Sequence, residues 1–237
     1  MNRYLILTIL ILVFYLPSYI SNDLLARLTD EDGIYENIGA LLFLLTSLGF
    51  AALAAIPRLY PNKTRIGKYS ERYYFLFFAL LFFFAFGEEI SWGQRIFNFL
   101  TPESIKEHNI QGEFNVHNLD VFYGKTMDGE DKTGLSALLN LSRMFYVFLI
   151  IYLLILPLLF KYNSAVRKLT KKMSLPVPNF LLGIIFCFNL QYENVLRWIN
   201  SDLEVHGLVE IKEAAISLIV FALPLFWINF KNVKKKE

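Results

Sequence analysis

Long uncharged apolar runs, separated by short charged segments, constrain this chain more than any other feature of its sequence. A helix that crosses a bilayer needs about 20 mostly apolar residues, because lipid offers backbone amides no partner outside their own helix. The runs lack the period-two alternation of a transmembrane β-strand. We therefore predict an all-α, polytopic transmembrane bundle of about six helices, forming one integral membrane domain over residues 1–237. The predicted spans are about 4–20, 38–56, 73–98, 144–160, 179–198 and 212–230.

Composition agrees with a membrane protein and excludes several function classes. Hydrophobic residues make up 55% of the chain, above the roughly 45–50% of soluble domains. The single cysteine, Cys187, excludes an internal disulfide and a cysteine-rich zinc site. The sequence has no Gly-rich phosphate loop, no Gly-x-Ser-x-Gly elbow and no His-Glu-x-x-His motif. Nothing indicates nucleic-acid binding, since topology and anionic lipids account for basic clusters at membrane edges.

The first apolar run, residues 4–20, has an alternative interpretation as a cleaved signal peptide. However, no small-x-small cleavage site follows it, since residues 18–22 are Ser-Tyr-Ile-Ser-Asn. We therefore interpret the run as an uncleaved signal-anchor helix.

The basic residues gather in alternate connecting segments, and this predicts the orientation of the chain. Cytoplasmic loops carry an excess of Lys and Arg, and six spans place all of these segments, with both termini, on the cytoplasmic side. Most of the 23 basic residues lie in them. They are Arg3, then Arg58, Lys63, Arg65, Lys68 and Arg72, then Lys161, Arg167, Lys168, Lys171 and Lys172, and finally Lys231, Lys234, Lys235 and Lys236.

The acidic residues show the opposite distribution. Of the 21 acidic residues, all but Glu71 and Glu237 lie in the outer segments or in the helix ends beside them. Acidic residues contribute little to the insertion rule, so the skew needs another cause. It indicates a polar site on the non-cytoplasmic side, although a solvated outer surface would also explain the acids of the loops.

The third apolar run turns polar at its end, where residues 87–95 are Gly-Glu-Glu-Ile-Ser-Trp-Gly-Gln-Arg. Adjacent carboxylates at a membrane edge are unfavourable unless they are paired, protonated or bound to a cation. This segment therefore predicts a ligand, metal or catalytic site, the alternative being a structural ion pair between Glu88 and Arg95. In a continuous helix one face would carry Glu88, Ser91, Trp92 and Arg95.

A second polar segment, residues 109–118, alternates strictly between polar residues and apolar residues or Gly. This period predicts a short extended strand with one polar face turned to a cavity. The alternative is an exposed strand whose apolar face packs on the protein.

Polar residues also occur at the outer ends of the other predicted spans. Glu36 and Asn37 precede the second span, where nearby acids would also serve as helix caps. Glu193 and Arg197 have the i, i+4 spacing of a structural ion pair. Glu210 and Glu213 share a face at the start of the last span, and acids at a membrane edge are candidates for function.

A bundle would bring these outer segments together, and carboxylates with one His suit Zn, Mn, Mg or Ca. We therefore predict a divalent metal ion as cofactor. The predicted catalytic residues are Glu88, Glu89, Arg95 and His117. The predicted substrate-binding residues are Glu36, Trp92, Gln94, Asn109, Gln111, Asn115 and Asn118. The predicted metal ligands are Glu113, His117, Glu210 and Glu213.

Residues 87–95, followed by the pattern Asn-x-Gln-x-Glu-x-Asn-x-His-Asn at 109–118, resemble an uncharacterised family of bacterial multipass membrane proteins. The resemblance implies a bacterial cytoplasmic (inner) membrane protein and carries no activity with it. CAAX-type intramembrane proteases are a fainter likeness. Their paired Glu matches Glu88 and Glu89, but the position of their Arg is occupied here by Gly93.

The alkaline ceramidases are a second faint likeness, because they carry acids and Asn before their second span, as Glu31, Glu36 and Asn37 do here. Their zinc site needs three His and a Ser. The three His of this chain are not paired at helical spacing, which argues against that site.

Three functions remain open from the sequence. The first is a metal-dependent hydrolase or transferase acting on a lipid or lipid-linked substrate at the outer leaflet, with a metal-bound water as nucleophile and Arg95 holding an anionic head group. The second is an ion-coupled carrier, although no inverted repeat is visible. The third is a non-enzymatic accessory protein that docks a partner on the outer side.

Overall fold

The structure, a computed structural model, describes residues 2–30, 33–56, 58–60 and 71–228, without the side chain of Arg95. Helices account for 72% of it, and the described residues contain no β-strand. The prediction of an all-α fold is therefore confirmed. In chain order the α-helices are α1 (Arg3–Phe14), α2 (Leu16–Ile20), α3 (Asn22–Leu28), α4 (Ile34–Ala55), α5 (Glu71–Glu89), α6 (Gln94–Phe97), α7 (Glu103–Lys106), α8 (Leu141–Ile150), α9 (Leu156–Tyr162), α10 (Ser164–Met173), α11 (Phe180–Ile199) and α12 (Val205–Trp227).

Two helical stretches are long and apolar enough to cross a membrane, namely α4 and the continuous stretch Leu141–Tyr162 formed by α8, a π-helix at Ile151–Ile155 and α9. A third apolar helix, α1, is shorter. By length and composition these helices indicate a membrane protein. The longer helices α5, α11 and α12 carry charged residues inside their ends.

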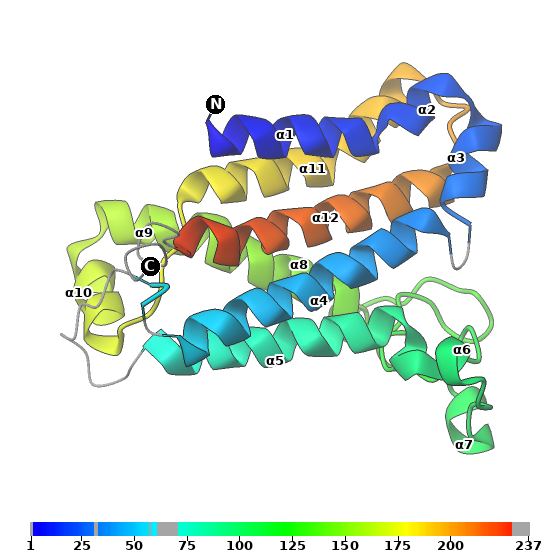
Figure 1. Ribbon diagram of the computed structural model, residues 1–237. Helices are drawn as coiled ribbons and strands as arrows, with labels where there is room; N and C mark the ends of the chain where they lie inside the picture. The colour runs from blue at the N-terminus through cyan, green and yellow to red at the C-terminus, as the bar shows by residue number, and fades with distance from the viewer. Residues whose placement is uncertain (1, 31–32, 57, 61–70, 229–237) are drawn as a thin grey trace, which may run out of the picture.

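Helix α12 runs through the middle of the bundle, between α4 on one side and α11 and α1 on the other (Figure 1). It buries residues around most of its circumference, as a central helix must. Helix α5 packs against α4 through stacked rings. The ring centroid of Phe50 lies 5.8 Å from that of Phe82 and 6.2 Å from that of Phe75. Helix α10 lies at one end of the bundle, and α3, α6 and α7 lie at the other (Figure 1).

The helix predicted over 73–98 is interrupted, which corrects the sequence prediction. Helix α5 ends at Glu89, and Ser91, Trp92 and Gly93 follow with φ values of 45°, 53° and 82°. Such left-handed geometry is unfavourable for residues with a Cβ and persists only where neighbours hold it. Residues 88–95 therefore do not lie on one continuous helical face.

The strand predicted over 109–118 is also wrong. The segment forms a looped series of turns, in which Asn109 bridges back to Leu119 and Gly112 turns the chain with a φ of 70°. The Asn109 Oδ1 atom accepts hydrogen bonds from the backbone amides of Gln111 and Glu113, both at 3.1 Å. Side chains that bond to the local backbone in this way replace the ladder of a strand.

Helix α11 approaches the π-helix closely at Gly183. Pro157 has no N–H to donate to the carbonyl of Leu153 four residues earlier, and the helix is wider at this point. A Cβ at position 183 would lie 2.4 Å from that carbonyl oxygen. The Leu153 carbonyl therefore faces a helix surface on which only glycine fits.

Replacing Gly183 with valine is expected to destabilise the protein by about 1–3 kcal/mol, because the helices must separate to accept the side chain. Thermal unfolding in detergent measures this loss. Ile184→Val is the control, since Ile184 is the next residue of α11 and is exposed. Equal melting temperatures for both variants would contradict the close approach.

Candidate functional site

A pocket of about 600 Å³ lies at the end of the bundle where α5 ends and α12 begins. Its walls come from α4, α5, α8, α12 and the loop that follows α7. One part of the wall is polar and acidic, and the other part is aromatic and aliphatic. The polar part includes Asp30, Glu36, Glu88, Glu89, Gln111, Glu113, His117, Asn118, Tyr123, Ser142, Tyr146, His206, Glu210 and Glu213.

The acidic side of the pocket is built where α5, α4 and α12 meet. Glu89 lies within electrostatic reach of Glu213, Glu210 and Glu36. Tyr146 of α8 donates to the Glu213 Oε1 atom at 2.7 Å. Among the described residues no group donates a hydrogen bond to Glu89. The carboxylate of Glu89 is thus available to bind a ligand or a proton.

The neighbouring Glu88 points in another direction, because successive helical residues are rotated by about 100°. It is only 5% exposed. Its Oε1 accepts from the Trp92 indole N–H at 2.7 Å, and its Oε2 accepts from the backbone amides of Val116 at 2.7 Å and His117 at 2.8 Å. The His117 Nδ1 atom also lies 3.3 Å from this Oε2. Glu88 therefore fastens the loop over the pocket to the end of α5.

A second set of hydrogen bonds holds the same loop from the turn after α5. The Glu113 Oε2 atom accepts from Ser91 Oγ at 2.8 Å and from Asn115 Nδ2 at 2.7 Å. Gln94 donates to Thr101 Oγ1 at 2.8 Å and accepts from the Phe114 amide at 2.7 Å. These bonds explain how the strained turn at Ser91 persists.

Gly87 and Trp92 of the segment 87–95 pack against each other. The indole of Trp92 lies directly over Gly87, where an added Cβ would be 2.9 Å from the ring. The ring also makes an edge contact with Phe84 at 5.6 Å. Glycine at 87 therefore gives the indole room to reach Glu88.

The apolar part of the pocket lies between the bundle helices. Aromatic rings of α4, α5 and α8 form much of it, and the rings of Phe43 and Phe145 make an edge contact with their centroids 6.2 Å apart. Phe77 and Phe84 are 53% and 38% exposed, so this part of the wall reaches the outer surface of the bundle. The apolar lining is Phe43, Phe77, Leu81, Phe84, Ala85, Leu141, Phe145, Phe148, Val209 and Ile216.

The pocket has a strongly negative lining. In the described part of the chain, no Lys or Arg lines it. Lys212 of α12 instead pairs with Glu193 at 2.7 Å, and Arg197 lies 3.7 Å from the same carboxylate. Across the described residues, no three His, Cys, Asp or Glu side chains already stand in a group that would hold a metal ion.

The structure brings most of the predicted site residues together. Those that line the pocket are Glu36, Glu88, Glu89, Gln111, Glu113, His117, Asn118, Glu210 and Glu213. Those that hold the loop without lining the pocket are Trp92, Gln94, Asn109 and Asn115. The side chain of Arg95 lies outside the described part, so its predicted role stays a prediction.

Sequence reasoning missed Tyr146, Tyr123 and Ser142, which complete the polar part of the wall. Tyr146 was included in an apolar span, although its hydroxyl needs a partner when buried. A tyrosine near the outer end of a span is a signal that would have identified it.

Comparison of the chain with protein-family models, curated proteins and solved structures gives no match. The interpretation of the pocket therefore rests on its own residues.

Proposed function

We propose that this is a multipass protein of the bacterial cytoplasmic membrane with about six spans, both termini in the cytoplasm and the pocket on the opposite side. Support comes from the positions of the helices, since each predicted span is mostly helical, although the span predicted at 4–20 is divided into α1 and α2. Exposed apolar side chains on α1, α4, α5 and α8 also suit contact with lipid. Examples are Leu5, Leu41, Leu80 and Val147.

On this basis the pocket binds a lipid or lipid-linked molecule. The observation that carries the proposal is the union of two walls in one cavity, with carboxylates on one side and aromatic rings on the other. An amphiphile matches both, because its chain is removed from water beside the rings while its head group meets the polar wall. Ligand pockets typically combine an apolar lining with a few convergent polar groups.

The acidic residues of the pocket favour a positively charged head group. We propose that the head group brings positive charge to Glu89, Glu210 and Glu213, because a positive group stabilises these carboxylates in their ionised form. The charge is either an amine of the lipid itself or a divalent ion bound to a phosphate head group. Binding such an ion requires these side chains to turn towards one another, since they do not form a metal group as they stand.

The proposed activity is hydrolysis or group transfer at that head group. A bound divalent ion would polarise the head group and activate a water molecule. Glu89 is the best placed general base, because no described donor occupies its carboxylate. Glu88, with its four hydrogen-bond contacts, acts instead as a positioning residue for the loop that carries His117.

Native mass spectrometry of the detergent-purified protein tests the binding proposal. The ligands are phosphatidylethanolamine, phosphatidylglycerol and a polyprenyl phosphate, each with EDTA or with Mg²⁺, Mn²⁺, Ca²⁺ or Zn²⁺. Binding of the amine lipid in EDTA supports a cationic head group, whereas binding of phosphate lipids only with a metal supports an ion-bridged one. Absence of binding in every condition overturns the proposal.

The variant Glu89→Gln/Glu213→Gln should weaken binding by at least about tenfold, or about 1.4 kcal/mol. Glutamine keeps the acceptor for Tyr146 but removes the charge. The matched control is Glu103→Gln/Glu107→Gln, which changes two exposed acids outside the pocket. Equal losses in both variants would exclude a specific role for the pocket acids.

Glu210 predicts the pH dependence of binding. Burial, with the neighbouring Glu213 and Glu36 carboxylates, raises the pKa of Glu210 from 4.5 to about 8. The folded protein therefore holds a proton that the unfolded chain has released, so its stability without ligand should fall as pH rises from 4.5 to 8. A positive ligand favours the ionised carboxylate, so binding should tighten over pH 6–9.

Melting temperatures with and without ligand, measured from pH 6 to pH 9, check this prediction. Glu210→Gln should flatten both pH profiles, because the amide does not titrate. Unchanged profiles in this variant would assign the pH dependence to another group, such as His206, whose Nδ1 lies 3.9 Å from Glu210 Oε1.

The raised pKa of Glu210 also favours a second candidate, a proton- or cation-coupled carrier. Cation flux into liposomes that depends on Glu210, without turnover of any lipid, would select the carrier over the hydrolase or transferase.

A further inference from the structure

The end of the bundle opposite the candidate site carries a short basic helix, α10. It follows the membrane-length stretch Leu141–Tyr162 after one residue, Asn163, whose side chain caps α10 by accepting from the amides of Ala165 and Val166. Arg167 secures the junction, because its guanidinium donates to the carbonyl oxygens of Phe160, at 2.9 Å, and Lys161. Helix α10 is thus held where the apolar stretch ends.

The residues of α10 divide into two arcs around the helix. At 100° per residue, Ala165, Leu169 and Met173 form one stripe, and the basic residues fill an adjoining arc in which Lys172 lies next to Ala165. Leu169 is 55% exposed and Met173 is 37% exposed. The helix contains no acidic residue, and its basic residues are Arg167, Lys168, Lys171 and Lys172.

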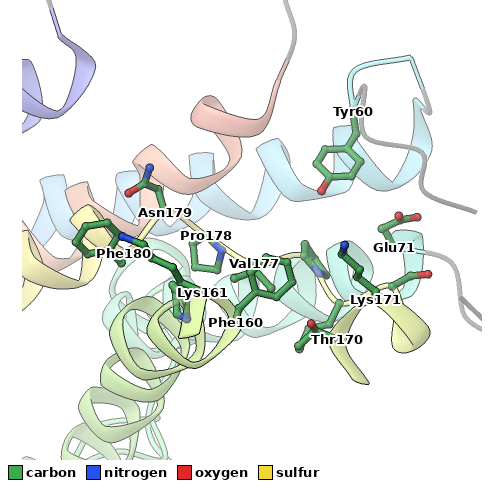
Figure 2. Close-up of a pocket in the computed structure, with 14 residues that line it drawn as sticks. Tyr60, Glu71, Phe160, Lys161, Thr170, Lys171, Val177, Pro178, Asn179 and Phe180 are labelled. Carbon is green, nitrogen blue, oxygen red and sulfur yellow. The ribbon is translucent and has the colours of Figure 1, made fainter. Parts of the chain in front are cut away.

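A second feature adds positive charge at the same corner. Lys161 of α9 and Lys171 of α10 line one pocket of about 400 Å³ (Figure 2). Among the described residues that line this pocket, Glu71 is the acidic one. Tyr74 of α5 donates to the carbonyl oxygen of Met173 at 3.1 Å, and Tyr152 donates to that of Pro176 at 2.9 Å. These bonds fix α10 and the following loop against the bundle, so the basic surface is rigidly placed.

We propose that α10 lies in the surface of the anionic, cytoplasmic leaflet and binds its phospholipid head groups. The inference depends on the membrane topology proposed above. An exposed apolar stripe beside a basic face is the composition of helices that lie in the membrane interface. Lysines beside an anionic leaflet are each attracted to its head groups, and α10 carries four basic residues and no acidic residue.

Spin-label depth measurements in nanodiscs test the position of α10. Single cysteines replace Leu169, Lys168 and Leu80 in a Cys187→Ala background, and accessibility to oxygen is compared with accessibility to a water-soluble nickel chelate. The label at 169 should lie in the acyl region and the label at 168 at the aqueous surface. The label at 80, on an exposed position of α5, checks that the bundle is embedded.

The outcomes separate the two proposals. A water-exposed label at 169 with an embedded label at 80 overturns the inference and leaves the membrane fold intact. Water exposure at both positions overturns the membrane proposal and this inference with it.

The choice of lipid is tested with Lys168→Gln/Lys172→Gln. The ratio of phosphatidylglycerol to phosphatidylethanolamine retained by the protein in native mass spectra should fall about fivefold or more. The control is Lys106→Gln/Lys125→Gln, which removes two exposed lysines from the segment between α6 and α8. An unchanged ratio in the α10 variant overturns the inference.

Discussion

Replacing Glu88 with alanine is expected to release the loop that covers the pocket and to destabilise the protein by about 3 kcal/mol or more. The change removes the acceptor for the Trp92 indole and for the amides of Val116 and His117. Each donor that stays buried without an acceptor bears its own desolvation penalty. The turn at Ser91 and Trp92, which has left-handed geometry, loses one of its supports as well.

Hydrogen–deuterium exchange over residues 109–120 and thermal unfolding measure this effect. The matched control is Glu89→Ala, because Glu89 is the adjacent residue and accepts no hydrogen bond from the described residues. The control should keep the loop protected while it alters ligand binding. Equal exchange rates in the two variants would contradict the division of labour between the two glutamates.

This division could not be inferred from the sequence, in which Glu88 and Glu89 have the same chemistry. Periodicity placed Glu88 near Trp92, and the structure has that contact at 2.7 Å. The partners of the other carboxylate oxygen come from the loop at 116 and 117, which lies far along the chain. Only the three-dimensional fold shows that Glu88 is held by hydrogen bonds to the loop, whereas Glu89 accepts none from the described residues.

The positions of the helices followed from the apolar runs, because burial or lipid contact over many residues leaves a strong pattern. The breaks did not. Ser91 and Trp92 adopt a positive φ against their intrinsic preference, and hydrogen bonds from distant residues hold them there. The alternation over 109–118 was misleading for a related reason, since the Asn109 side chain accepts from the backbone amides of Gln111 and Glu113 and does not line the pocket.

The convergence of the outer acids was within reach of the sequence, since helix ends on one side of a bundle are neighbours. Glu36, Glu89, Glu210 and Glu213 come from three helices and line the same pocket. Their ligand is not determined by that placement, because the same carboxylates suit an amine, a metal ion or a proton. The apolar wall supports the second part of the proposal, which is that the ligand carries an apolar chain.

Replacing Ala85 with tryptophan should therefore weaken the binding of long-chain lipids by at least about tenfold and leave the carboxylates untouched. Ala85 lines the apolar part of the pocket on α5, where an indole would occupy the space of the chain. Leu80→Trp is the control, because it adds an indole to the same helix at a position 62% exposed and outside the pocket. Native mass spectrometry would compare long-chain phosphatidylethanolamine with its dihexanoyl counterpart, which carries the same head group. If the variant loses only the long-chain lipid, the chain lies between α5 and α8. If the Ala85 variant binds the long-chain lipid fully, the carboxylates bind their ligand without an apolar chain, and the proposed amphiphile site is overturned.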